Sequence, residues 1–148
     1  MLRRLVLTSA LLAVSSSVAA ADGASLFSNN CVACHRKGGV GTPGLAPPLV
    51  SDTIKKAGSV ERDYVPLVII HGLSGSIKVN GQTFVSAMPP RGDLSDDDVA
   101  SLANYVLHDL NHLAADKSKP LAKADIALLR KTTVDHQALR DMRSKFGE

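Results

Sequence analysis

Cys31-Val32-Ala33-Cys34-His35 carries two thiols three positions apart, followed at once by an imidazole. This spacing is the pattern of a c-type haem attachment site. Each thiol can add to one vinyl group of haem, and the two thioether links then fix the porphyrin to a short length of backbone. His35 is held beneath the iron by this attachment and is predicted to be its proximal ligand. The five residues therefore predict one haem c, bound covalently through Cys31 and Cys34.

Two other uses of paired cysteines are disfavoured by the surrounding sequence. A structural zinc site needs about four ligands, and no second pair of Cys or His follows Cys31 and Cys34 at a suitable interval. A thioredoxin-like motif follows a buried strand, whereas residues 24–30 have the pattern of a short helix. A haem-free thiol–disulfide protein stays open as an alternative, and a haem assay on the purified chain distinguishes it.

The first residues have the pattern of a secretory signal peptide. Arg3 and Arg4 form a positive start, residues 5–14 are a short apolar run, and residues 18–21 are small enough for cleavage. We therefore expect a cleavable signal peptide over residues 1–21 and a periplasmic location. No later segment approaches the ~20 apolar residues of a membrane-spanning helix, so no stable membrane span is expected.

Charge divides the rest of the chain into two parts. Residues 22–113 hold 7 basic and 9 acidic side chains, and residues 114–148 hold 8 basic and 5 acidic ones. We expect a haem-carrying domain over residues 22–113 and a basic helical C-terminal extension over residues 114–148. The basic residues form no run with interleaved aromatic residues, so no nucleic-acid partner is expected.

Helical periodicity and turn signals outline the first part of the domain. A helix is expected over residues 23–33, and a loop rich in Gly and Pro over residues 37–49. A second helix is expected over residues 63–71, ending before a glycine. Residues 77–85 alternate around an Asn-Gly pair, which is a strong hairpin signal.

The best-marked helix begins after Ser95, because Asp98 three residues later completes a close variant of the capping box. Two short basic helices are expected beyond it, over residues 120–130 and 133–146. The fold class is therefore all-α with one short β-hairpin. The apolar stripe expected on the Ser95 helix consists of Val99, Leu102, Ala103, Val106, Leu110 and Leu113.

A haem iron bound by His35 keeps one open axial position, and the group that occupies it influences both potential and reactivity. Met88 lies just after the predicted hairpin, in a turn stiffened by two prolines. A thioether favours ferrous iron and closes the site to oxygen, so Met88 is the expected distal ligand. His71 is the alternative, since it ends an apolar helix and would give a bis-histidine iron.

Beyond these motifs, residues 22–113 resemble a class I, mono-haem cytochrome c. In that family a glycine and an aromatic residue lie eight and four positions before the first cysteine, where this chain has Gly23 and Phe27. The resemblance implies that both pack against a leucine and an aromatic residue on the last helix of the domain. Leu102 and Tyr105 match that pair.

The same resemblance implies further site residues and a fold. Pro47 matches a proline whose carbonyl holds the ring of the proximal histidine, and Met88 matches the distal ligand. The implied architecture is the class I cytochrome c fold, with helices packed around one haem. Residues 71–82 and 88–90 are similar to a narrower group, namely small bacterial electron carriers and domains fused to or paired with periplasmic oxidoreductases.

These observations predict a single-electron carrier rather than an enzyme, because the sequence has no visible catalytic constellation of its own. The expected partners are periplasmic redox proteins or an oxidoreductase subunit, met through short-lived contacts near the haem edge. A rival hypothesis is a haem enzyme or gas sensor in which Met88 is absent from the iron or easily displaced. Carbon monoxide binding to the ferrous protein distinguishes the two.

Overall fold

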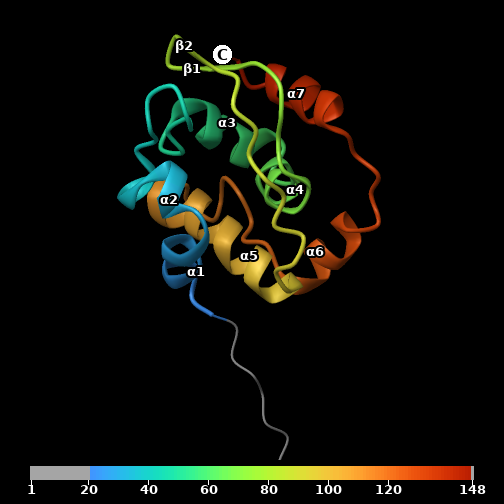
Figure 1. Ribbon diagram of the computed structural model, residues 1–148. Coiled ribbons are helices and arrows are strands. Elements are labelled where there is room, and N and C mark those ends of the chain that lie inside the picture. The colour runs from blue at the N-terminus through green and yellow to red at the C-terminus, as the bar shows by residue number, and fades with distance from the viewer. Residues whose placement is uncertain (1–20, 148) are drawn as a thin grey trace, which may run out of the picture.

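A computed structural model describes residues 21–147, and within them the chain forms seven α-helices and one two-stranded antiparallel sheet (Figure 1). This agrees with the expected all-α class and its hairpin. In chain order the elements are α1 (Gly23–Asn30), α2 (Val32–His35), α3 (Asp52–Val60), α4 (Tyr64–His71), β1 (Ile77–Val79), β2 (Gln82–Phe84), α5 (Asp96–Asn104), α6 (Lys123–Leu129) and α7 (His136–Ser144). A 3₁₀ turn at Lys37–Gly39 and a π-helical segment at Tyr105–Leu110 complete the list.

The first helix crosses α5 at very short range. Asp22 caps α1, since its carboxylate accepts the backbone N–H of Ser25 at 2.9 Å. A Cβ on Gly23 would lie 2.5 Å from the Ser101 carbonyl oxygen, so only glycine allows this approach. Phe27 packs on Tyr105 with ring centroids 5.5 Å apart. The contacts of Gly23 and Phe27 with Tyr105 that the resemblance implies are therefore present. The single helix expected over residues 23–33 is instead divided at Cys31, between α1 and α2.

Helix α5 begins as expected and ends differently. The Ser95 hydroxyl accepts the N–H of Asp98 at 3.1 Å, so Ser95 caps the helix. The last turns, Tyr105–Leu110, are π-helical. Because π-helical bonds connect residues five apart, the wider turn rotates the following side chains. Leu107, absent from the expected stripe, is buried with 1% exposure, whereas Leu110 is only partly buried.

Helix α3 was not anticipated from the sequence. Its cap is Ser51, whose hydroxyl accepts the N–H of Ile54 at 3.3 Å. The buried Asn111 holds the start of this helix in place. Its side-chain oxygen accepts the N–H of Ser51 at 3.1 Å, and its amide donates to the carbonyls of Leu49 and Val106 at 2.9 and 2.8 Å. Asn111 thus joins the loop that follows the haem motif to the end of the α5 segment.

Helix α4 packs on α5, and the hairpin follows it in the chain. Helix α4 ends at Gly72, which has a φ of 73°. The β1–β2 register pairs Ile77 with Phe84, and the connecting Asn80 and Gly81 both have positive φ, as a type I′ turn requires. The hairpin is therefore the one predicted from its Asn-Gly pair.

The C-terminal residues run back over the domain rather than away from it (Figure 1). Helix α6 packs on α5 and α7 packs on α4. Asn104 of α5 exchanges two hydrogen bonds of 2.8 Å with the backbone of Leu121. Ile126 and Phe146 belong to the same hydrophobic core as Phe27. Residues before and after position 113 therefore share one hydrophobic core.

Opposite charges join this extension to α5. Arg130 contacts Asp96 at 2.5 Å and Lys123 contacts Asp97 at 2.7 Å. The acidic first turn of α5 thus meets the basic extension.

None of the helices in residues 21–147 has both the length and the apolar character needed to cross a bilayer. The signal peptide expected at residues 1–21 lies outside the described residues except for its last position.

Candidate haem site

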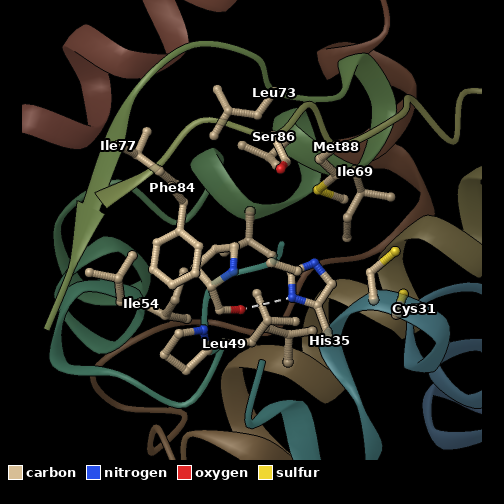
Figure 2. Close-up of a pocket in the computed structure, with 18 of the residues that line it drawn as sticks. Cys31, His35, Leu49, Ile54, Ile69, Leu73, Ile77, Phe84, Ser86 and Met88 are labelled. Carbon is tan, nitrogen blue, oxygen red and sulfur yellow. Dashed lines mark hydrogen bonds between the residues drawn. The ribbon is translucent and has the colours of Figure 1, made fainter. Parts of the chain in front are cut away.

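A large apolar cavity opens between α2, α4 and the hairpin (Figure 2). Its empty space, counted out to the mouth, is about 1340 Å³. This volume includes open solvent at the mouth. The lining is mostly apolar, which suits the flat hydrocarbon faces of a tetrapyrrole. The site residues predicted from the sequence all line it: Cys31, Cys34, His35, Pro47 and Met88.

His35 lies on one side of the cavity with its ring orientation fixed. Its Nδ1 is 2.9 Å from the carbonyl oxygen of Pro47. Because a carbonyl only accepts, Nδ1 must carry the hydrogen, which leaves Nε2 with a free lone pair. Figure 2 shows Nε2 turned into the cavity. Burial lowers the pKa of His35, opposed by the hydrogen bond to Pro47, so the ring is neutral at pH 7, the form that binds metals.

The loop after the motif holds the Pro47 carbonyl in place. Gly41 donates its N–H to the His35 carbonyl at 2.8 Å, and the Thr42 hydroxyl donates to the Cys34 carbonyl at 2.7 Å. Gly41 has a φ of 79°, and a Cβ there would lie 2.7 Å from the carbonyl carbon of Pro47. Only glycine combines this conformation with this approach.

The two cysteines lie at one end of the cavity and form no disulfide with each other. Cys31 is partly buried and Cys34 is exposed. Burial raises the pKa of the Cys31 thiol to about 11. Both sulfurs are therefore next to the cavity and free to form other covalent links.

Met88 lies on the side of the cavity opposite His35, with its sulfur facing the ring (Figure 2). It pairs with Leu73 in an isolated β-bridge, with N–H to carbonyl distances of 2.8 and 3.1 Å. A Cβ on Gly72 would lie 2.5 Å from the Met88 carbonyl oxygen. The end of α4 and the Met88 turn are therefore packed backbone to backbone.

His71, the alternative distal ligand, is not among the residues that line the cavity. Within residues 21–147 no group of three or more His, Cys, Asp or Glu side chains is arranged to hold a metal ion by itself. The donor set that the structure assembles is thus one imidazole and one thioether facing each other across an apolar space. Two free thiols at its edge complete a set that fits haem c.

Comparison with known proteins agrees with this geometry. Residues 18–106 match the family described as "Cytochrome C oxidase, cbb3-type, subunit III". A cytochrome c-552 of Thermus thermophilus is 31% identical over 135 residues, covering 88% of this chain and 89% of that protein. The chain belongs to the cytochrome c family.

Two further relatives cover shorter parts of this cytochrome. Cytochrome c6 of Microcystis aeruginosa is 36% identical, over 58% of this chain and 91% of that protein. The cbb3-type cytochrome c oxidase subunit CcoP of Azospirillum is 35% identical, over 68% of this chain but only 34% of that subunit. The match to the Thermus protein must include part of the C-terminal extension, because 88% of 148 residues is more than the 113 that precede it.

Membership of this family establishes the general role of the chain. It is a class I, mono-haem c-type cytochrome that carries haem c and transfers electrons, rather than an enzyme.

Sequence reasoning missed two residues near the site. The side-chain amide of Asn111 positions the loop after the motif, and no local pattern marks it. Arg143 of α7 lines the cavity, although in the sequence it is one of several basic residues of the extension.

Proposed function

We propose that this cytochrome is a periplasmic single-electron carrier with haem attached to Cys31 and Cys34 and iron held between His35 and Met88. The observation that carries the proposal is the placement of the imidazole and the thioether on opposite sides of one apolar cavity, with both thiols at its edge. When bound, haem supplies an iron that accepts and releases one electron.

The residues around the cavity suit repeated electron transfer with little rearrangement. The Pro47 carbonyl holds the His35 ring in one orientation and makes the imidazole a better electron donor. The bridge to Leu73 holds the Met88 turn against α4. A histidine and a thioether that both stay in place leave no open position for oxygen and keep the potential high.

Export and partners follow from the sequence. The expected signal peptide over residues 1–21 directs the chain to the periplasm, where haem is attached. We expect its partners to be other periplasmic redox proteins or an oxidoreductase subunit, in line with the name of the CcoP relative. Such contacts are small and short-lived.

The first experiment expresses the full-length chain in a host with haem-ligation machinery and isolates the periplasmic fraction. We expect a red protein whose mass equals the processed chain plus one haem, with a pyridine haemochrome spectrum typical of two thioether links. A colourless processed protein would overturn the proposal, and a red protein retained in the cytoplasm would overturn its location.

The second experiment replaces Met88 by Ala. Because the thioether closes the distal side, we expect loss of the sulfur–iron absorption band, a lower midpoint potential and rapid, stoichiometric carbon monoxide binding to the ferrous protein. Met142→Ala is the matched control, since it removes a partly buried methionine of the C-terminal helix. A Met88→Ala protein with an unchanged band and potential would refute this ligand assignment.

A further inference from the structure

Arg143, on the C-terminal helix α7, is a buried charged residue that lines the cavity. Its relative exposure is 7%. Nη1 donates to the hydroxyl oxygen of Tyr64 at 3.4 Å, and Nη2 donates to the carbonyl oxygen of Lys78 at 3.3 Å. The buried Nε has no hydrogen-bond partner among the described residues. The guanidinium is thus held by two long, neutral contacts.

This arrangement differs from that of three other arginines in the chain. Arg62, Arg91 and Arg130 each contact an aspartate, at 2.8, 3.0 and 2.5 Å. All three are more exposed than Arg143, yet each has a carboxylate. Burying an unpaired charge is strongly unfavourable, because the charge loses its hydration and gains no partner. The least hydrated of these four guanidiniums is therefore the one for which the described chain supplies no anion.

Arg143 also lies at a particular end of the cavity. It donates to the carbonyl of Lys78 in β1, between Ile77 and Val79. Figure 2 shows Cys31 at one end of the cavity and Ile77 at the other. Arg143 therefore lies at the end away from the thiols. In haem, the two vinyl groups and the two propionates occupy opposite edges of the ring, so a ring tied to the cysteines directs its carboxylates toward the hairpin.

We propose that Arg143 is a positioning residue that binds a haem propionate and supplies the positive charge that neutralises it. This inference rests on the proposed attachment of haem to Cys31 and Cys34. A planar guanidinium with an unpartnered Nε–H matches a carboxylate, which accepts two parallel N–H donors. Tyr64 assists, because its oxygen accepts from Arg143 and its own hydrogen stays available to a second acceptor.

The proposal gives the C-terminal extension a role in the redox site. Helix α7 carries Arg143 into the cavity, while Leu139 and Phe146 on either side of it in sequence are buried in the core. Packing of the extension therefore positions the charge. A neutralised propionate no longer stabilises ferric iron, so Arg143 raises the tendency of the haem to accept an electron.

The test compares full-length holoproteins carrying Arg143→Gln, Arg143→Lys and, as a control, Lys145→Gln. Lys145 follows the same helix and is exposed, so its replacement removes one charge from the surface. We expect Arg143→Gln to lower the equilibrium constant for haem reduction about tenfold, which is about 59 mV for one electron. We expect Arg143→Lys to stay within about threefold of the wild type because the charge remains, and Lys145→Gln to be unchanged because solvent screens it.

Each result decides the proposal. A potential unchanged in Arg143→Gln, with covalent haem and the sulfur–iron band intact, would overturn it. Equal shifts in the Gln and Lys variants would also overturn it, because they would indicate a structural effect instead of a charge effect. If Arg143→Gln yields no holoprotein, the infrared spectra of wild type and Arg143→Lys decide, since loss of the guanidinium must shift the propionate carboxylate bands and identical bands refute the contact. A wild type without covalent haem contradicts the proposed function instead.

Discussion

The two sides of the haem cavity are built in different ways. On the His35 side, the loop that directly follows the motif holds it: Pro47 binds the ring, and Gly41 and Thr42 bind the backbone of the motif. On the Met88 side, the turn that carries Met88 is held by the backbone just after α4, on the far side of the hairpin, through the bridge to Leu73.

This difference indicates that the two proposed axial ligands are not equally easy to displace from the iron. His35 directly follows a cysteine that we propose is covalently linked to the porphyrin. A local structural change is therefore expected to reorient its ring and not to remove it from the iron. Met88, the proposed distal ligand, has no such attachment, and a thioether is a weak ligand. Any change that moves the Met88 turn away from α4 is therefore expected to open the iron.

The largest effect on ligation is expected from Gly72→Ala. A Cβ there would lie 2.5 Å from the Met88 carbonyl oxygen and 2.8 Å from the nitrogen of Pro90, at a φ of 73°. Positive-φ strain and overpacking each cost about 1–3 kcal/mol. Since the alternative to strain is movement of the Met88 turn, we expect the sulfur–iron band to weaken or vanish and carbon monoxide to bind.

Gly81→Ala is the matched control for Gly72→Ala. It has a similar φ, 78°, but a Cβ there would meet nothing within 4 Å. We expect Gly81→Ala to lower the free energy of unfolding by about 1 kcal/mol and to leave the band intact. Equal effects of the two substitutions on the band would show that backbone strain, and not displacement of Met88, is responsible.

A smaller effect is expected on the other side from Gly41→Ala. A Cβ there would lie 2.6 Å from the nitrogen of Pro48 and 2.7 Å from the carbonyl carbon of Pro47. Displacing that carbonyl weakens the hydrogen bond to His35 and makes the imidazole a poorer donor. We expect a modest change in midpoint potential with both ligands retained, measured by redox titration and absorption spectroscopy.

Gly44→Ala provides the comparison within the same loop, because it has a φ of 74° and open space around the new Cβ. Its potential should match the wild type. Loss of His35 from the iron in Gly41→Ala would contradict the expectation that the proximal ligand is harder to displace than Met88.

Ile126→Ala separates stability from ligation. Ile126 is fully buried in the core shared by α6 and the rest of the domain and does not line the cavity. Removing its side chain should lower the free energy of unfolding by about 2–5 kcal/mol, measured by chemical denaturation. We expect the midpoint potential and the sulfur–iron band to stay at their wild-type values, and a large shift in either would mean that both sides of the cavity respond to core packing in general.

The smallest effect is expected from Asp125→Asn. Hydrogen bonds from the Ala122 N–H and the nearby Arg62 lower the pKa of Asp125 below its usual 3.8. The ionised carboxylate therefore stabilises the fold above pH 3.8, and this contribution is lost as the pH falls through the lowered value. Since both side chains are partly exposed, we expect a loss below about 1 kcal/mol at pH 7, shrinking toward zero in acid. A difference that grows in acid would contradict this origin.

The sequence alone determined the features that depend on residues lying close together along the chain. The motif at residues 31–35, the Ser95 cap and the Asn-Gly hairpin each depend on a few adjacent residues, and local interactions do not change with the rest of the fold. The identity of the cofactor follows from the first of these.

The tertiary structure alone decided the features that depend on which surfaces meet. Helix α3 needs Asn111, some sixty residues later, to hold its start. The burial of Leu107, which the predicted stripe left out, depends on the core that it packs against. Among the basic residues of the extension, Arg143 is the one that lines the cavity, because α7 docks on α4. The physical reason is that burial is a property of two surfaces in contact, and sequence patterns describe only one of them.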